Sequence, residues 1–124
     1  MKILFAEDEK INAMLTIRLL EKSEHEVVHV KDGSAALSTY QENTPFDLIL
    51  MDVQMPGMDG LEAASAIRAF ESSKGMTRTP IIAMTAFSDS GDEKRCREAG
   101  MDHYLVKPVN FEKLEEAMQQ LKAE

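Results

Sequence analysis

Acidic side chains follow two short apolar runs in this sequence, at positions where carboxylates could do chemistry. Glu7 and Asp8 come directly after the run ILFA, and Asp52 comes directly after the run DLILM. Clustered carboxylates repel one another, which raises the pKa of at least one of them unless a cation compensates. Oxygen ligands without a cluster of His or Cys favour magnesium or manganese over zinc. If the fold brings these carboxylates together, they predict a site for Mg²⁺ or Mn²⁺.

A hydroxyl group and a lysine follow two later apolar runs. Thr85 and Ala86 come after the run PIIAM, and Lys107 comes after the run YLV. A nucleophilic carboxylate, a divalent metal, a lysine and a hydroxyl together meet the needs of phosphoryl transfer, whose catalysis is largely positioning and charge neutralisation. Asp52 is the expected acceptor, because an unpaired charge at the mouth of a buried strand would be costly without a function.

Each of these residues also has an ordinary structural interpretation. Acids after the first run are favoured at a helix start by the helix dipole, and Thr85 would serve as a helix cap. Lys107 would then be one more exposed lysine. The hypothesis of a functional site therefore rests on the four segments together rather than on any one residue.

The elements that must position these residues are five strands. Three clear apolar runs span residues 3–6, 47–51 and 80–84. Two weaker runs span residues 27–30 and 104–106. The clear runs are continuous rather than alternating, which is typical of parallel strands that helices cover on both faces.

Helix-length segments lie between and after these runs. The first carries one apolar stripe at helical spacing, and the last carries another behind the N-cap candidate Asn110. The stripes consist of Ile11, Met14, Leu15 and Leu19, and of Phe111, Leu114, Met118 and Leu121. Weaker helices are expected near residues 34–42, 60–71 and 88–98, the last ending at Gly100.

Strand and helix alternate five times over 124 residues, which predicts one domain spanning residues 1–124. The fold class is α/β, a doubly wound five-stranded parallel sheet with right-handed crossovers. The common strand order for such a flavodoxin-like sheet is 2-1-3-4-5, with ligands bound beyond the carboxyl ends of strands 1 and 3. That rule places Glu7, Asp8 and Asp52 at one site.

The composition limits the partners and the compartment. There are 14 Lys and Arg against 22 Asp and Glu, a net charge of -8, which disfavours direct binding to nucleic acid or an anionic membrane. Cys96 is the single cysteine, and no apolar stretch is long enough for a membrane span or a signal peptide. We therefore expect a cytoplasmic protein without membrane insertion.

The motifs resemble the receiver domain of two-component response regulators over nearly the whole chain. The similarity lies in the stretches FDLILMDVQMPGMDGLEA, PIIAMTA and AGMDHYLVKPV, which have the right order and follow the predicted strands. The motif MDVQMPGMDG is most similar to that of receivers of hybrid histidine kinases. The resemblance implies the flavodoxin-like receiver fold and a phosphoacceptor switch rather than a turnover enzyme.

The resemblance also implies a role for each matching residue. Asp52 would take a phosphoryl group from a histidine kinase or a histidine phosphotransfer domain. Asp8 would bind Mg²⁺ directly, Glu7 would act on the same ion through water, and the main-chain carbonyl of Gln54 would complete the protein's ligands. Lys107 would hold one phosphoryl oxygen.

The resemblance further implies a conformational switch. Thr85, with the main-chain N–H of Ala86, would hold another phosphoryl oxygen, and its movement would let Tyr104 turn inward. An unknown output protein would read the face formed by helix 4, strand 5 and helix 5. Pro108 is expected to follow a cis peptide bond, and Pro56 and Gly60 belong to the loop after the acceptor.

The sequence departs from the family pattern at the acid pair, where Glu7 replaces the commoner aspartate. Its longer side chain could shift metal geometry. Phe87 is apolar at a position that borders the path of attacking water in this family. We therefore expect a long-lived phosphorylated state.

Alternative functions remain open. A phosphohydrolase of the haloacid dehalogenase type also uses a strand-end aspartate, but it needs a second acid where Gln54 stands. A calcium-binding loop starting at Asp52 would need a bidentate acid where Ala63 stands. An interaction module of receiver type that never takes phosphate is the third alternative.

Overall fold

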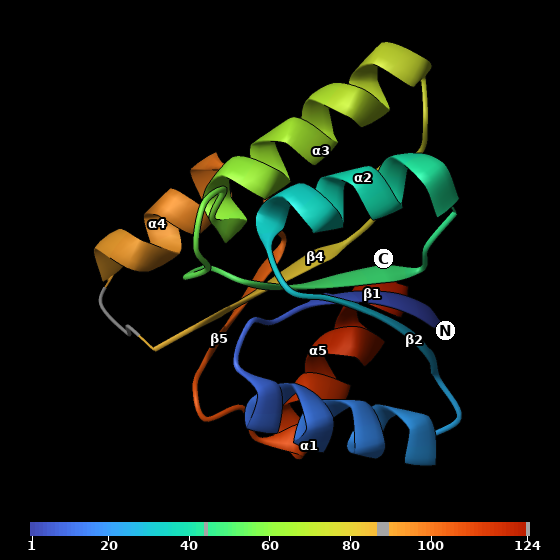
Figure 1. Cartoon of the computed structure of the whole chain (residues 1–124), viewed down its shortest axis with the longest axis vertical. Helices are drawn as coiled ribbons and strands as arrows, with labels where there is room; N and C mark the ends of the chain where they lie inside the picture. Colours follow the sequence, from blue (N-terminus) through green and yellow to red (C-terminus); the bar gives the residue numbers. More distant parts are fainter. Residues whose placement is uncertain (44, 87–89, 124) are drawn as a thin grey trace.

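The computed structural model describes residues 1–43, 45–86 and 90–123 and has five strands that alternate with five helices (Figure 1). The strands are β1 (Lys2–Ala6), β2 (Glu26–Val30), β3 (Leu48–Asp52), β4 (Ile81–Thr85) and β5 (His103–Val106). The helices are α1 (Lys10–Lys22), α2 (Gly33–Asn43), α3 (Gly60–Lys74), α4 (Ser90–Glu98) and α5 (Phe111–Ala123). The start expected for the fourth helix, residue 88, lies outside the described residues.

All strand pairs are parallel, and the strand order is β2-β1-β3-β4-β5. The predicted fold class and strand order are therefore confirmed. The winding reverses at β1, because β2 lies on one side of it and β3 on the other. The carboxyl ends of β1 and β3 consequently meet at the edge where doubly wound sheets bind ligands.

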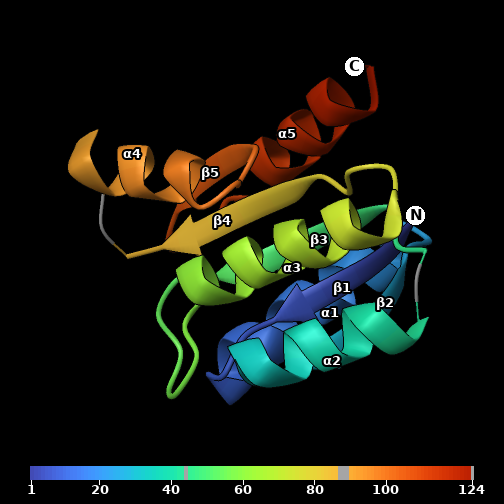
Figure 2. The ribbon, with the colours of Figure 1, turned by 90° about the horizontal axis from the view of Figure 1, so that it is seen from above.

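Helices cover both faces of the sheet (Figures 1 and 2). Successive strand residues point to opposite faces, so Leu4 and Ile49 pack under α2, α3 and α4, while Phe5 and Leu50 pack against α1 and α5. The three central strands are buried on both sides, since β3 and β4 are buried throughout and β1 is buried from Ile3 to Ala6. This burial explains why their sequences are continuous apolar runs.

The apolar stripe expected on the first helix does not face the core. Ile11, Met14, Leu15 and Leu19 are exposed, Ile11 by 65% and Leu15 by 56%. The buried side of α1 carries Ala13 and Leu20 instead, so the predicted helix is present but its apolar stripe lies on the exposed side. The last helix behaves as predicted, because Leu114 and Met118 are buried and the Asn110 carbonyl oxygen Oδ1 accepts the N–H of Glu112 at 2.8 Å.

Candidate functional site

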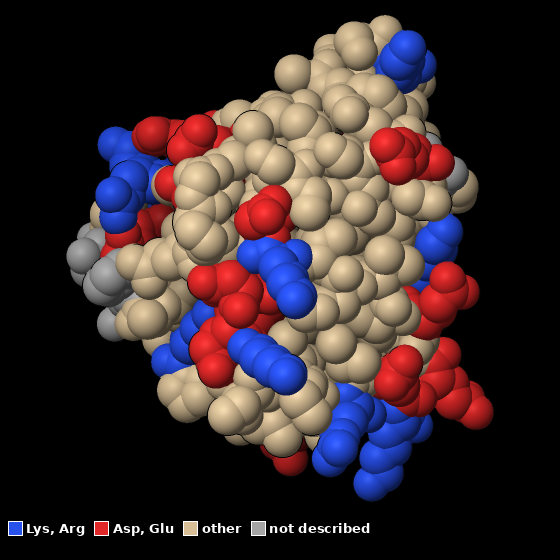
Figure 3. All heavy atoms as spheres, in the orientation of Figure 1, with Lys and Arg blue, Asp and Glu red and all other residues tan. Residues whose placement is uncertain are grey.

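The residues singled out from the sequence meet at the carboxyl edge of the sheet. Glu7 and Asp8 follow β1, Asp52 and Thr85 are the last residues of β3 and β4, and Lys107 follows β5. Figure 3 shows acidic side chains gathered with basic ones near the start of α2 and the loops before α1 and α3. The surface over α2 and α3 beside them carries few charges in this view.

Lys107 lies between the two buried carboxylates. Its Nζ is 2.9 Å from Oε1 of Glu7 and 2.9 Å from Oδ2 of Asp52. Glu7 is 3% exposed and Asp52 is 2% exposed, so both acids are removed from water. The remaining carboxylate oxygens accept main-chain N–H groups, from Glu9 at 3.2 Å and from Gln54 at 3.0 Å. The two buried carboxylates and the partly exposed Lys107 form one charge cluster.

The cluster holds more negative charge than Lys107 can balance. Burial, together with the hydrogen bond and charge of Glu7, raises the pKa of Asp52 to about 7, although Lys107 and the Gln54 N–H oppose the shift. Burial would also raise the pKa of Glu7, but hydrogen bonds with Asp52, Lys107 and Glu9 lower it below its ordinary value. In the absence of a cation, Asp52 therefore keeps its proton up to about neutral pH, while Glu7 is ionised.

The same acids fit a divalent cation. Glu7, Asp8 and Asp52 each offer a carboxylate oxygen, and these atoms lie within 4.8 Å of one another. Asp8 is exposed, so it offers a ligand on the solvent side of the cluster. Carboxylate oxygens suit a hard ion such as Mg²⁺. Bound in addition to the Lys107 ammonium group, such an ion would relieve the repulsion between Glu7 and Asp52 that contributes to the raised pKa of Asp52.

The other residues implicated by the resemblance lie in or just after β3, β4 and β5. Thr85 is buried, Ala86 is exposed, and the N–H of Lys107 donates to the main-chain oxygen of Thr85 at 2.7 Å. Tyr104 is half-buried and packs against the core on the side of α2, α3 and α4. Gln54 is exposed two residues after Asp52.

The loop after Asp52 approaches the strand closely. Pro56 is exposed, and Gly57 has a φ of 70°, a left-handed conformation that favours glycine. A Cβ atom on Gly60 would collide with the main-chain oxygen of Asp52, and the N–H of Gly60 donates to the oxygen of Val53 at 3.0 Å. Glycine at residue 60 thus lets α3 begin against the end of β3.

The Lys107–Pro108 peptide bond is cis, as the resemblance implies. Phe87, on which the expectation of a long-lived phosphorylated state depends, lies outside the described residues. That expectation stays a prediction.

Sequence reasoning missed one residue at this edge. His29 lies in β2, and its Nε2 is 2.9 Å from the main-chain oxygen of Glu7. In the sequence His29 stands 22 residues from Glu7 without a ligand-like spacing, so only the pairing of β1 with β2 could have indicated the contact.

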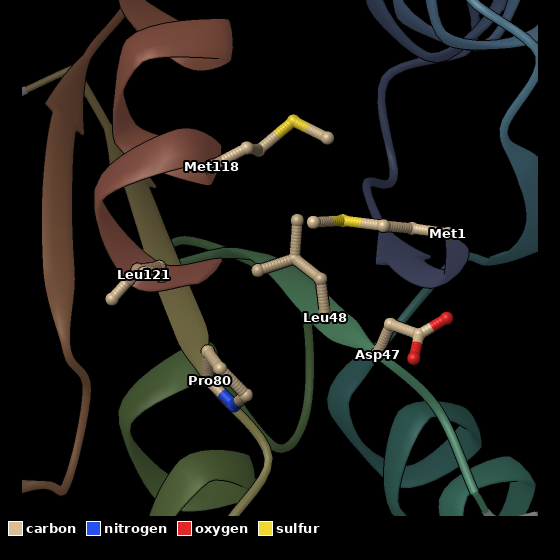
Figure 4. Close-up of a pocket in the computed structure, with 6 residues that line it drawn as sticks. All are labelled: Met1, Asp47, Leu48, Pro80, Met118 and Leu121. Carbon is tan, nitrogen blue, oxygen red and sulfur yellow. The ribbon is translucent and has the colours of Figure 1, made fainter. Parts of the chain in front are cut away.

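A separate hollow at the opposite edge of the sheet carries no comparable chemistry (Figure 4). It encloses about 350 Å³ and is lined by Met1, Asp47, Leu48, Pro80, Met118 and Leu121. Its one ionisable side chain, Asp47, accepts the main-chain N–H of Lys2 at 2.7 Å. This hollow has no group placed to react.

A parallel sheet of this order, with acids and a lysine at its carboxyl edge, is the architecture of a signalling receiver. Residues 3–119 match the family described as the response regulator receiver domain, so the chain belongs to that family. It is 42% identical over 113 residues to the sensor protein GacS of Pseudomonas syringae pv. syringae. The match covers 91% of this chain and 12% of GacS, so the chain spans a small part of that relative.

Two solved receiver structures are similar to the whole fold. The receiver domain of the Saccharomyces cerevisiae regulator Ssk1, in complex with the histidine phosphotransfer protein Ypd1, has a TM-score of 0.91 at 31% identity, covering 96% of this chain and 86% of that one. The receiver of the sensor histidine kinase PA1611 of Pseudomonas aeruginosa has a TM-score of 0.84 at 37% identity, and the match covers 96% of this chain and 94% of that one. The PA1611 receiver holds a magnesium ion in its active-site cleft.

Within the described residues, no helix combines the length and the apolar character that crossing a membrane requires.

Proposed function

We propose that this chain is a phosphoacceptor switch of a two-component system or phosphorelay, in which Asp52 receives a phosphoryl group from a phosphohistidine. The observation that carries the proposal is the buried Asp52 carboxylate, held 2.9 Å from Lys107 beside a second acid. In the transfer, the N–P bond of the phosphohistidine breaks and an O–P bond forms at Asp52. The leaving imidazole keeps the electron pair and takes up a proton.

Glu7, Asp8, Asp52 and the main-chain carbonyl of Gln54 are the proposed ligands of Mg²⁺. The bound ion supplies positive charge that offsets the charge developing on the phosphoryl oxygens. The acidic cluster and the magnesium in the PA1611 receiver support this assignment, whereas nothing supports manganese in particular.

The lysine and the hydroxyl group flank the proposed phosphoryl position. Lys107 binds one phosphoryl oxygen, and Thr85 with the N–H of Ala86 binds another. Movement of Thr85 then lets Tyr104 turn inward, which alters the face of α4, β5 and α5 that an output protein reads. We place residues 1–124 in the cytoplasm, as a domain that is phosphorylated and dephosphorylated but turns over no substrate by itself.

The donor is a histidine kinase or a histidine phosphotransfer domain, a choice supported by the complex of Ssk1 with Ypd1 and by the kinase relatives. The exposed side of α1 is where we place this donor. Leu15 and Leu19 of α1, together with Pro108 and Val109, line a hollow of about 650 Å³ that also reaches Glu7 and Lys107. A protein that delivers phosphohistidine to Asp52 must cover the surface around the site, and it would bury this apolar patch.

Incubation with acetyl phosphate and Mg²⁺, followed by intact mass measurement, tests the proposed function. The expected result is the gain of one phosphoryl group that a chelator prevents and that Asp52→Asn lacks. No gain in the wild type would favour an interaction module that takes no phosphate. A gain that persists in Asp52→Asn would mean that another residue is the acceptor.

Replacing Leu15 with serine tests the donor surface separately. The variant should accept phosphate from acetyl phosphate at the wild-type rate, because the side chain is 56% exposed and contributes little to stability. Transfer from a phosphorylated histidine phosphotransfer protein that labels the wild type should slow about tenfold, since truncating a side chain that anchors the centre of an interface costs more than ~1 kcal/mol. Glu21→Ser, an exposed change elsewhere on α1, is the control. Equal transfer to both variants would exclude this side of α1 as the donor surface.

A further inference from the structure

The main chain of Glu7 is held from both sides by the end of β2. Its N–H donates to the main-chain oxygen of Val30 at 3.1 Å, and its carbonyl oxygen lies 2.9 Å from Nε2 of His29. A carbonyl oxygen can only accept, so Nε2 of His29 carries the proton and donates it. Among the described residues, no main-chain N–H donates to this carbonyl. The imidazole therefore takes the place of a ladder hydrogen bond at the point where β2 ends.

The imidazole ring is itself fixed. His29 is paired with Phe5 in the register of β1 and β2, and the two ring centroids are 5.6 Å apart with 34° between the planes. The ring is half-buried and lines a hollow of about 320 Å³ together with Asp8, Ala13 and Met14. Because packing restrains the ring, its N–H is already aimed at the Glu7 carbonyl before any ligand binds.

His29 donates a hydrogen bond to the peptide unit that joins Glu7 and Asp8, the two acids expected to bind the divalent cation. The carbonyl belongs to Glu7, and the next residue is Asp8, so a rotation of this peptide would move both carboxylates. Asp8 is exposed and Glu7 is buried, which means that their separation depends on the main-chain conformation between them. Groups that orient metal ligands typically change metal affinity about 10- to 100-fold when they are removed.

We infer that His29 is a positioning residue, whose Nε2–H holds the Glu7–Asp8 peptide in the conformation that binds the divalent cation. The inference rests on the proposed function, because it concerns the metal site that Asp52 shares. It adds a residue from an edge strand to that site. His29 touches neither the acceptor nor the lysine.

Two substitutions separate the N–H donor from the ring. His29→Phe keeps a flat ring against Phe5 and removes the donor. His29→Gln removes the ring and keeps an amide N–H at the same number of bonds from the main chain. The affinity of each variant for Mg²⁺ is measured by calorimetric titration, with amide hydrogen exchange across residues 7–9 of the metal-free protein as a second measurement.

We expect His29→Phe to bind Mg²⁺ about tenfold more weakly than the wild type and to exchange faster at residues 7–9, while His29→Gln stays near the wild type in both. At saturating Mg²⁺, labelling of His29→Phe by acetyl phosphate should recover, as fits a residue that acts through the metal site. Wild-type affinity and exchange in His29→Phe would overturn the inference, as would equal weakening in both variants. Absence of Mg²⁺ binding by the wild type would instead overturn the proposed function, and this inference with it.

Discussion

Replacing Arg68 with methionine is expected to lower the free energy of unfolding by roughly 3–5 kcal/mol, because it removes the cation from a buried polar network. Nη1 of Arg68 donates to Oε1 of Glu71 at 2.7 Å and to the main-chain oxygen of Thr79 at 2.7 Å. Nη2 donates to Asp102 at 2.8 Å, and Nε donates to the oxygen of Gly100 at 2.9 Å. Arg68 thereby joins α3 to the residues before β4 and β5.

The cost is large because two of the partners, Glu71 and Thr79, stay buried when Arg68 is gone. Glu71 is 4% exposed, and its other oxygen accepts the hydroxyl of Tyr40 at 2.6 Å and the N–H of Thr79 at 2.8 Å. Without the guanidinium, the Glu71 carboxylate keeps these donors but loses its countercharge in a site away from water.

Arg78 provides a matched control for this variant. It also bonds to Asp102 and to the oxygen of Gly100, but its side chain is 55% exposed. An exposed ion pair contributes at most about 1 kcal/mol, so Arg78→Met should change stability little. Urea unfolding measures both variants. Similar losses of unfolding free energy in Arg68→Met and Arg78→Met would show that burial does not determine how much this network stabilises the fold.

This network could not be predicted from the sequence, whereas the strands could. A continuous run such as DLILM reports burial on both faces within a few residues, so local composition suffices. Tyr40, Arg68 and Asp102 come from three separate segments, and the bonds that join the network span up to 39 residues. No spacing in the chain records such contacts, because they follow from the packing of α2 and α3 on the sheet.

In the first helix, the spacing of apolar residues did not indicate which side is buried. Two apolar sets recur at helical spacing on α1; Ile11 and Leu15 lie on the exposed set, and Ala13 and Leu20 lie on the buried one. The connection from Ala6 to Lys10 is three residues long, and Glu9 caps the helix by accepting the N–H of Asn12 at 2.7 Å. This short, capped connection fixes the rotation of α1, so the small Ala13 faces the sheet. Apolar content alone cannot show which of two sets is buried.

The edge of the sheet that carries the candidate site was predictable for a different reason. The carboxyl ends of parallel strands meet at one edge, so residues after separate runs converge without any knowledge of side-chain packing. This argument brought Asp8, Asp52 and Lys107 together correctly. It could not indicate that Lys107 bonds to both buried acids, or that His29 supports Glu7, since those contacts depend on side-chain conformation.

Asp52→Asn is expected to remove most of the loss of stability that the metal-free protein shows as pH rises from about 5 to about 8. The native carboxyl group, with a pKa of about 7 against an ordinary value of 3.8, keeps a proton that the unfolded chain has already released. A group with a raised carboxyl pKa stabilises the fold most at low pH, and this contribution disappears as pH rises through the native value. Over about two pH units, one proton corresponds to about 2–3 kcal/mol.

The neighbouring groups act outside this pH window. The lowered pKa of Glu7 makes its contribution fall only as pH drops below the ordinary value of 4.5. The raised pKa of Lys107 makes its contribution fall only above the ordinary value of 10.5. The difference between wild type and Asp52→Asn therefore isolates the Asp52 carboxylate.

Urea unfolding in the presence of a chelator, repeated across this pH range, measures the difference. The two stability curves should lie closest below the ordinary pKa of 3.8, and the advantage of Asp52→Asn should grow by about 2–3 kcal/mol between about pH 5 and about pH 8, where the wild type buries an additional negative charge. Added Mg²⁺ should narrow the gap by stabilising the wild type, because a ligand that binds the native state shifts unfolding by mass action. Parallel curves without metal would mean that Lys107 balances both acids, and the repulsion that we expect a bound cation to relieve would then be absent.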